Sequence, residues 1–218
     1  MDLAVFDLDH TLLHDDSDRG WNRFLVDIGV VSDQEFADSN ERWYQEYTRG
    51  TLDIREYNRW AFRLHRQHGS AQVTQWRNQY VRERVPAMVA KRTPEVLEWH
   101  RNQGHRLLVI TATSTFIAGP IIEHIGIQDY LGLENEIVDG EYTGELIGIP
   151  TFQAGKVEAL AQWRAAQSET YDRVWFYSDS RNDLPLLEQA DHPVAVDADE
   201  VLTARATEAG WKIMSFRD

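Results

Sequence analysis

The sequence predicts an α/β fold: an open, mostly parallel sheet whose first strand is followed by an all-helical insertion. Three observations support this fold. Leu3–Leu8 (LAVFDL) is a short apolar run with no polar alternation before Asp7, which is typical of a parallel strand buried on both faces. From Asp16 to Val85 the pattern is helical. After Pro86, strand-like and helix-like segments alternate, as they do in β/α units.

The helical insertion carries its own start and stop signals. They are two capping boxes and three glycines placed as helix ends: Ser32 with Glu35, Asp53 with Glu56, and Gly29, Gly50 and Gly69. These signals predict about four helices and no strand. We therefore expect residues 14–90 to form a helical cap domain, and residues 1–13 with 91–218 to form the α/β core domain.

The remaining elements continue the β/α alternation. In chain order they are a helix from Thr93-Pro94 to Gly104, a strand at Arg106–Thr111, a helix through Ile121 and Ile122, a hairpin at Glu136–Leu146 turning at Asp139-Gly140, a helix from Gly155-Lys156, a strand at Arg173–Tyr177, a helix through Leu186, a strand at Pro193–Val196, a further helix, and a strand at Trp211–Phe216. This Rossmann-like arrangement binds ligands beyond the carboxyl ends of its strands.

Composition limits the class of protein. The 218 residues are 42% apolar, enough for one core with a sizeable insertion, and the absence of Cys excludes disulfides and thiolate metal sites. A formal net charge of −14 argues against nucleic acid or an anionic membrane surface as partner. No apolar run approaches the roughly 20 residues of a membrane span, and no signal peptide is evident. We expect a cytoplasmic protein, either a monomer or a weak dimer.

Polar side chains follow several of the predicted strands and helix starts. They form four clusters: Asp7 with Asp9, Thr111 with Thr113, Lys156, and Asp179 with Asp183. Because the carboxyl ends of parallel strands meet at one edge of a sheet, these clusters should converge. The sequence therefore predicts a single polar site at this edge.

The first cluster suits phosphoryl transfer. A turn at Leu8 or Asp9 can bring Asp7 and Asp9 toward one ligand, although the two alternate along the strand. Asp7 can then attack phosphorus to give an aspartyl-phosphate, and Asp9 can protonate the departing alkoxide and later deprotonate the attacking water. We therefore predict a phosphomonoesterase that acts on a small phosphorylated metabolite.

An anionic nucleophile and an anionic phosphate repel each other, so this chemistry needs cations. Asp7 and Asp179 supply the hard oxygen ligands that suit Mg²⁺. Asp183, four residues after Asp179 and expected on the same helical face, would orient a metal-bound water or the Asp179 side chain. Lys156 at a helix start can place its ammonium and the helix dipole on a phosphoryl oxygen. Thr111 can donate its hydroxyl to another oxygen.

Each of these polar residues also has a purely structural interpretation. Asp9 can cap the segment after the strand, Thr111 can be an ordinary strand end, and Lys156 can be a solvated helix residue. Asp179 and Asp183 can serve as turn and helix-cap residues. Their joint occurrence at one predicted edge, in the chain order acid, hydroxyl, lysine, acids, favours a catalytic site.

The same residues resemble the motifs of a known family. The chain looks like a haloacid-dehalogenase-superfamily phosphatase of the phosphoserine-phosphatase-like branch. Within that branch, its motif sequences most resemble those of bacterial histidinol-phosphatase-type members. The matching segments are Asp7-Leu8-Asp9-His10-Thr11, Ile110-Thr111-Ala112-Thr113, Gly155-Lys156, and Ser178-Asp179-Ser180-Arg181-Asn182-Asp183. The resemblance covers essentially the whole chain and implies that the insertion is a cap over the active site.

The resemblance implies a role for each motif residue. Asp7 would be the nucleophile and Asp9 the acid/base, with Mg²⁺ held by Asp7, Asp179, Asp183 and the backbone carbonyl of Asp9. The phosphate group would be bound by four further residues, Thr111, Ala112, Lys156 and Asn182. Asp16, nine positions after Asp7, matches an acidic residue that binds the substrate amine in phosphoserine phosphatases.

Substrate identity is predicted less directly. Thr111-Ala112-Thr113 replaces the Ser-Gly-Gly segment of phosphoserine phosphatases, and the insertion is rich in aromatic residues that can pack the cap or stack on an imidazole. Acidic residues at the cap entrance, Asp15, Asp16 and Asp18, suit an ammonium group but can equally be a solvated helix start. We expect histidinol phosphate, an intermediate of histidine biosynthesis, as the substrate. The alternatives are phosphoserine or phosphohomoserine, phosphoryl transfer to a second substrate, and a non-catalytic binding module.

Overall fold

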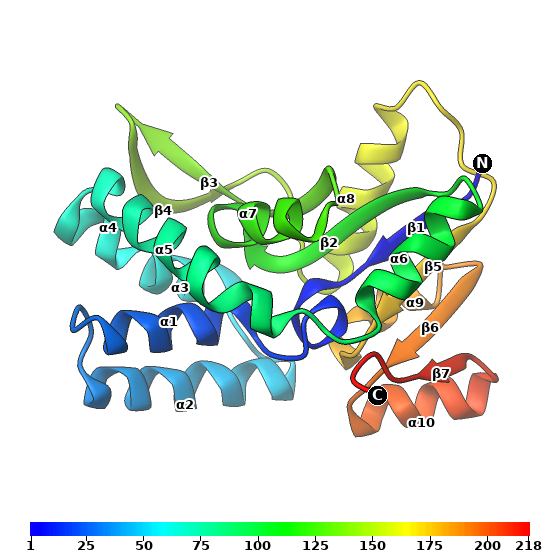
Figure 1. Cartoon of the computed structure of the whole chain (residues 1–218), viewed down its shortest axis with the longest axis horizontal. Coiled ribbons are helices and arrows are strands. Elements are labelled where there is room, and N and C mark those ends of the chain that lie inside the picture. Colours follow the sequence, from blue (N-terminus) through cyan, green and yellow to red (C-terminus); the bar gives the residue numbers. More distant parts are fainter.

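A seven-stranded sheet forms the centre of the molecule (Figure 1). The computed structural model describes residues 1–218, except for the side chain of Asn40. The strand order is β4-β3-β2-β1-β5-β6-β7, and every neighbouring pair is parallel except β3 with β4. The predicted α/β fold is thus confirmed. The strands are β1 (Leu3–Phe6), β2 (Arg106–Ser114), β3 (Asp129–Val138), β4 (Glu141–Ile147), β5 (Val174–Ser178), β6 (His192–Val196) and β7 (Lys212–Met214).

Strand β1 lies in the middle of the sheet and is fully buried, as its uninterrupted apolar pattern predicts. Its last residue, Phe6, pairs with Val109 of β2 and Tyr177 of β5. One residue later, the backbone N–H of Asp7 donates to the carbonyl of Tyr177 at 2.9 Å. The ends of β1, β2 and β5 therefore meet at one edge of the sheet.

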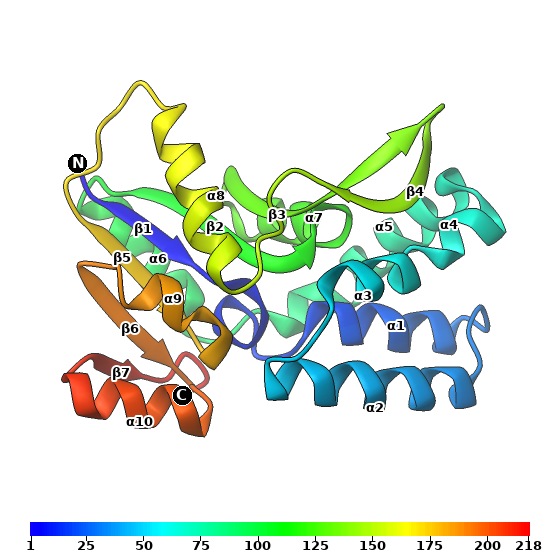
Figure 2. The same ribbon diagram turned by 180° about the vertical axis from the view of Figure 1, so that it is seen from behind.

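Helices cover both faces of the sheet. Alternate residues of β1 divide between two hydrophobic clusters, with Ala4 and Phe6 in one and Leu3 and Val5 in the other. Helices α6 (Thr93–Asn102) and α7 (Thr115–Ile125) pack on the first face, while α8 (Ala154–Ala165), α9 (Leu184–Leu187) and α10 (Glu200–Ala209) supply the second cluster, seen from behind in Figure 2. This arrangement explains why the central strand β1 is apolar throughout.

The insertion consists of five helices rather than about four. They are α1 (Ser17–Asp27), α2 (Asp33–Arg49), α3 (Ile54–Ala61), α4 (Arg63–His68) and α5 (Ser70–Met88). The extra break falls at Phe62, whose side chain is buried while its backbone leaves the helical range. Both predicted N-caps form, since the side chains of Ser32 and Asp53 accept from the N–H groups of Glu35 and Glu56. The reciprocal half of each capping box does not form, because Glu35 pairs with Arg63 and Glu56 with Arg42.

Helices α1 and α2 lie side by side beyond the carboxyl edge of the sheet (Figure 1). Buried residues of α1 and α5, such as Phe24 and Tyr80, belong to the same hydrophobic cluster as Phe6 of β1. The division into a core domain and a cap domain at residues 14–90 stays a prediction. None of the helices in the described part of the chain is long and apolar enough to cross a membrane.

Several predicted boundaries differ from the structure. The hairpin predicted at Glu136–Leu146 is the outer part of a longer strand, because β3 begins at Asp129 and first pairs with β2 in parallel. Strand β2 continues three residues past Thr111 to Ser114, and the final strand is shorter than predicted, covering Lys212–Met214. Pairing with a neighbouring strand determines where each of these strands begins and ends. Local composition does not show this pairing.

A buried histidine joins the insertion to the β3–β4 hairpin. The His65 ring stacks on Phe62 at a centroid distance of 4.9 Å and lies edge-on to Phe116 and Tyr142, each at 4.7 Å. Its Nδ1 lies 3.2 Å from the hydroxyl of Ser70. Burial in this apolar environment lowers the pKa of His65 to about 4.

Lowering the pH from 7 to 5 should therefore destabilise the protein through His65. The unfolded chain, in which the pKa is 6.5, takes up a proton that the folded state excludes until about pH 4. The stabilisation is thus complete above pH 6.5 and is lost as the pH falls toward 4. A shift of this size corresponds to roughly 2 kcal/mol between pH 7 and 5. Urea denaturation of wild type and His65→Phe at both pH values measures it.

The exposed His124 provides the control substitution. His124→Phe should lose as much stability between pH 7 and 5 as wild type, whereas His65→Phe should lose less. Equal losses in all three proteins would show that His65 does not contribute to the pH dependence.

Candidate functional site

The chain turns sharply after β1. Residues Leu8–Leu12 form one π-helical turn that contains two non-helical residues, Asp9 and His10, the latter at φ 56°. This turn removes the strand alternation that would place Asp7 and Asp9 on opposite faces. Both side chains line the same cavity as a result.

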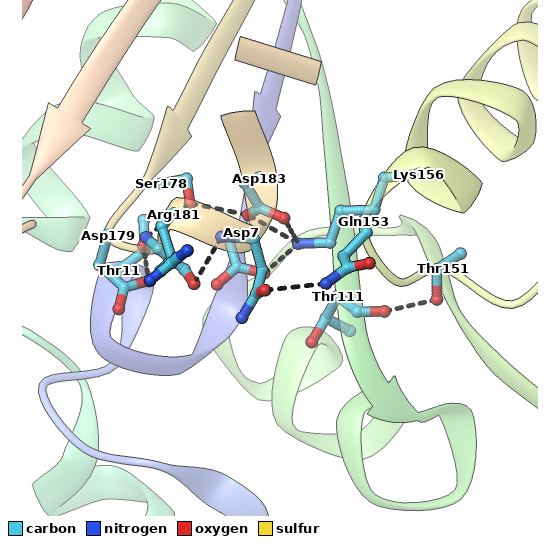
Figure 3. A network of polar contacts seen from close by, with 12 residues as sticks. Asp7, Thr11, Thr111, Thr151, Gln153, Lys156, Ser178, Asp179, Arg181 and Asp183 are labelled. Atoms are coloured by element: carbon cyan, nitrogen blue, oxygen red, sulfur yellow. Dashed lines mark hydrogen bonds and ion pairs between the residues drawn. The ribbon is translucent and has the colours of Figure 1, made fainter. Parts of the chain in front are cut away.

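A buried ion cluster joins three distant segments at this edge (Figure 3). The ammonium of Lys156, in the first turn of α8, donates to Asp7 Oδ1 and to the carboxylate of Asp183, both at 2.8 Å. Ser178 at the end of β5 donates its hydroxyl to Asp183 at 2.7 Å. The side chains of Lys156, Asp7 and Asp183 are at most 9% exposed. Three of the four predicted clusters therefore meet as expected.

Tight packing places α8 at this position. A Cβ on Gly155 would lie only 1.9 Å from the carbonyl oxygen of Pro150, so no larger residue fits without movement. The preceding Gln153 has φ 49° and ψ −125°, an unfavourable backbone conformation for a residue with a side chain. Both features bring the start of α8, and with it Lys156, close to the end of β1.

Asp9 is oriented by two hydrogen bonds. Its Oδ1 accepts from the backbone N–H of Ser17, the first residue of α1, at 2.6 Å. Its Oδ2 accepts from the hydroxyl of Thr113 at 2.7 Å. The insertion thus begins by holding the second carboxylate of the Asp7–Asp9 pair in place.

Three of the four predicted phosphate ligands, Thr111, Ala112 and Asn182, line the same cavity. The hydroxyl of Thr111 accepts from the N–H of Thr113 at 3.1 Å. Ala112 lies where the pairing of β2 with β3 shifts between Ile110 and Ser114. Asn182 lies on the 3₁₀ turn after β5 and lines the cavity as well.

Asn182 and Gln153 connect the sheet edge to the end of α2. The amide of Gln153 donates to the carbonyl of Gly50 and to Asn182 Oδ1, each at 3.1 Å. The amide of Asn182 donates to the carbonyl of Tyr47 at 3.1 Å. These bonds hold the end of α2 against the edge of the sheet, where the carbonyl of Tyr47 also accepts from the N–H of Gly50.

Asp179 and Asp183 do not share a helical face, contrary to the sequence-based expectation. Asp179 lies directly after β5, and its Oδ1 accepts from the hydroxyl of Thr11 at 3.2 Å. A 3₁₀ turn at Arg181–Asp183 then directs Asp183 toward Lys156. The expected contact by which Asp183 orients Asp179 is replaced by separate partners for the two carboxylates.

The charges of the site do not balance without a further cation. Burial, together with Asp183 and Asp9, raises the pKa of Asp7 to about 7 in spite of Lys156. Burial and the neighbouring Asp7 and Asp183 raise the pKa of Asp179 well above its ordinary value. Asp183 and Asp7 in turn outweigh burial and raise the pKa of Lys156. One ammonium thus faces three carboxylates, which fits a divalent cation.

Within the described residues, no three His, Cys, Asp or Glu side chains are arranged as a complete metal-binding group. This finding is compatible with Mg²⁺, which keeps several waters and needs only one or two carboxylates from the protein. The groups that could hold it are the carboxylates of Asp7 and Asp179 and the backbone carbonyl of Asp9. Asp183 is connected to Asp7 by Lys156, whose ammonium contacts both carboxylates.

A cavity of about 430 Å³ extends from Asp7 to the insertion. Its lining at the sheet edge includes Asp9 and Thr111, and its lining from the insertion is acidic and aromatic: Asp16, Asp18, Trp43, Tyr57 and Trp60. Asp16, predicted to bind a substrate amine, lies in this wall. Its Oδ1 also caps α1 by accepting from the N–H of Arg19 at 2.8 Å.

Sequence reasoning missed several residues that position the site. Thr11 could have been found from its place in the Asp-x-Asp-x-Thr segment, whereas Thr113 was expected at the site but not as the partner of Asp9. Ser17 acts through its backbone N–H, which no residue type reveals. Gln153 is a polar residue in a loop and carries no distinguishing signal in the sequence.

Comparison with known proteins identifies relatives that span the chain. The family model described as haloacid dehalogenase-like hydrolase matches residues 4–188. A histidinol-phosphatase from Neisseria meningitidis is 35% identical over 219 residues, covering 99% of each chain. A probable phosphatase from Mycobacterium tuberculosis is 26% identical, covering 98% of this chain and 75% of its own.

Solved structures show the same architecture. A protein of unknown function from Bordetella pertussis superimposes with a TM-score of 0.90 at 32% identity, covering 98% of each chain. A phosphoserine phosphatase, captured as a phospho-aspartyl intermediate analogue, gives a TM-score of 0.67 at 17% identity and covers 100% of this chain and 94% of its own. At that identity the second likeness concerns the fold alone.

Replacing Gly155 by Ala should destabilise the protein more than an ordinary glycine substitution. The added Cβ would overlap Pro150, and the displacement of α8 would pull Lys156 from its two carboxylates. Overpacking of this kind costs about 1–3 kcal/mol, or several degrees in Tm. Thermal unfolding measures the difference.

Gly104→Ala is the matched control for that substitution. Gly104 has φ 73° and open space where its Cβ would lie, so Ala there introduces only backbone strain of roughly 1–2 kcal/mol. If Gly155→Ala lowers Tm no more than Gly104→Ala does, the close approach of α8 to Pro150 is not a constraint on the fold.

Proposed function

The chain belongs to the haloacid dehalogenase-like hydrolases and is a phosphomonoesterase, and we propose that Asp7 is the nucleophile that attacks the phosphorus of its substrate. The observation that carries this proposal is the buried contact of Asp7 with Lys156 beside a cavity that also contains Asp9. One oxygen of Asp7 is engaged by Lys156, which holds the carboxylate in a defined direction. The sequence predicts the same two residues, with Asp7 as nucleophile and Asp9 as acid and base.

In the first step, an oxygen of Asp7 forms a bond to phosphorus while the bond to the ester oxygen breaks. Asp9 gives its proton to the departing alkoxide. Thr111, Ala112, Lys156 and Asn182 surround the phosphoryl group in our proposal, and the ammonium of Lys156 offsets its negative charge. The product of this step is an aspartyl-phosphate on Asp7 and a free alcohol.

In the second step, water attacks the phosphorus of the aspartyl-phosphate. Asp9, now ionised, takes a proton from that water, and the Asp7 carboxylate leaves. The hydrogen bonds from Ser17 and Thr113 hold Asp9 in one orientation for both transfers. This accounts for a hydroxyl at position 113, where the phosphoserine-phosphatase pattern has no side chain.

Bound Mg²⁺ would supply positive charge against the phosphoryl oxygens. We propose that Asp7, Asp179 and the backbone carbonyl of Asp9 hold it, with Asp183 supporting the set. The excess of buried carboxylates over ammonium groups supports this assignment.

For the substrate, we propose histidinol phosphate, which would place the enzyme in histidine biosynthesis. The insertion lines the cavity with two carboxylates, Asp16 and Asp18, and with the rings of Trp43, Tyr57 and Trp60. This lining suits a substrate that carries both an ammonium group and an aromatic ring. The relative from Neisseria named histidinol-phosphatase, which matches over 99% of the chain, supports the same choice.

Asp7→Asn should abolish Mg²⁺-dependent release of phosphate from p-nitrophenyl phosphate, because the amide is a poor nucleophile and cannot form the aspartyl-phosphate. Asp139→Asn, at the exposed hairpin turn, makes the same chemical change away from the cavity and should retain wild-type rates. Circular dichroism checks that both variants fold. Turnover by Asp7→Asn at near wild-type rates would exclude Asp7 as nucleophile.

A phosphate-release screen separates the candidate substrates. We expect the highest kcat/KM for histidinol phosphate among histidinol phosphate, phosphoserine, phosphohomoserine and sugar phosphates. A higher value for phosphoserine would replace the proposed substrate. Loss of substrate without release of inorganic phosphate, when an alcohol is added, would show a phosphotransferase.

A further inference from the structure

Two carboxylates of the insertion line the cavity, and the structure gives them different tasks. The carboxylate of Asp16 caps α1 through the N–H of Arg19 at 2.8 Å. A cap of this kind is worth about 1 kcal/mol to the helix. Asp16 also lies next to Ser17, whose N–H orients Asp9. Its local hydrogen bond is sufficient to explain an acidic residue at this position.

Asp18 lies in the first turn of α1, where a negative charge favours the helix, but its carboxylate caps none of the backbone N–H groups that the structure describes. Its carboxylate accepts a single hydrogen bond within the described residues, from the hydroxyl of Tyr57 at 3.0 Å. Tyr57 belongs to α3, so this contact joins two helices of the insertion. No Arg, Lys or His side chain in the described part of the chain forms an ion pair with Asp18. A neutral hydroxyl orients the carboxylate but leaves its charge unbalanced.

Three aromatic rings lie together in the cavity lining, and one of them, Tyr57, donates to Asp18. Trp43, Tyr57 and Trp60 contact one another at centroid distances of 5.6 to 5.9 Å, and all three line the cavity. The guanidinium groups of Arg42 and Arg63 lie over the rings of Trp43 and Trp60 at 4.1 and 4.3 Å, and neither arginine is part of the cavity lining. The wall of the cavity here is therefore aromatic and acidic.

The charge of Asp18 depends on what occupies the cavity. Burial, followed by Asp16 and Asp9, raises the pKa of Asp18 to about 8. The two arginines that do line the cavity, Arg19 and Arg181, are exposed and do not contact it. A ligand ammonium placed beside Asp18 would be its only close positive partner among the groups described, and would favour the ionised carboxylate.

We propose that Asp18 and Tyr57 form the subsite that binds the ammonium group of the substrate, while the rings of Trp43 and Trp60 contact its aromatic ring. The substrate class is then a phosphate monoester of an aromatic amino alcohol. This inference rests on the proposed function and assigns the specificity to Asp18 rather than to the helix-capping Asp16. The charge-assisted hydrogen bond favours such a ligand over one that lacks the ammonium group, and the ring contact favours it over one that lacks the aromatic ring.

Two substrates that differ only in the ammonium group test this assignment: L-histidinol phosphate and its desamino analogue, 3-(imidazol-4-yl)propyl phosphate. Wild type should prefer the amine by kcat/KM. Asp18→Asn should reduce this preference about tenfold or more, mainly through KM, because a charge-assisted hydrogen bond contributes about 1.5–3 kcal/mol. Tyr57→Phe should reduce the preference in the same direction.

Asp16→Asn is the matched comparison, since Asn caps helices about as well as Asp. It should change kcat/KM for the two substrates by the same factor. If Asp16→Asn abolishes the preference and Asp18→Asn keeps it, the assignment is overturned.

Three further outcomes separate this inference from the proposed function. If wild type hydrolyses both esters equally, Asp18 is not an ammonium subsite, while the phosphatase activity stands. If wild type hydrolyses p-nitrophenyl phosphate but neither ester, the substrate class is overturned and the mechanism through Asp7 stands. Failure with all three esters would overturn the mechanism itself.

Discussion

The buried ammonium of Lys156, held between Asp7 and Asp183, is the interaction on which the rest of the site depends. It joins the end of β1, the start of α8 and the turn after β5, which lie far apart in the sequence. Separating a buried charge from its partners costs several kcal/mol, so the three segments must meet closely. The absence of a Cβ at Gly155 and the unfavourable backbone of Gln153 become understandable as the means by which α8 approaches.

The same edge of the sheet also anchors the insertion. Ser17 binds Asp9 at the first turn of α1, and Gln153 and Asn182 bind the carbonyls at the end of α2. The helices that line the far wall of the cavity are thereby positioned against the proposed catalytic carboxylates by backbone hydrogen bonds. The start of α1 and the end of α2 therefore connect the proposed nucleophile Asp7 and its neighbours with the cavity wall that would select the ester.

Patterns with a fixed geometric meaning were predicted well. The apolar run before Asp7 identified the buried central strand, and both predicted N-cap residues, Ser32 and Asp53, cap their helices. The predicted meeting of Asp7, Lys156 and Asp183 is observed, because the carboxyl ends of parallel strands lie at one edge of the sheet. The break at Phe62, the start of β3 at Asp129 and the separate directions of Asp179 and Asp183 were missed, since pairing and packing between distant segments decide them.

The sequence by itself determined the α/β alternation, the helical insertion and the residues that would meet at the edge of the sheet, because periodicity and strand direction are local properties. The family of hydrolases follows from the same motifs. Only the tertiary structure decided which acidic residue caps a helix and which is left facing the cavity. Asp16 and Asp18 are the same residue type and lie two positions apart in the chain. They differ because Asp16 accepts from the backbone N–H of Arg19 in its own helix, whereas Asp18 accepts from the hydroxyl of Tyr57 in α3.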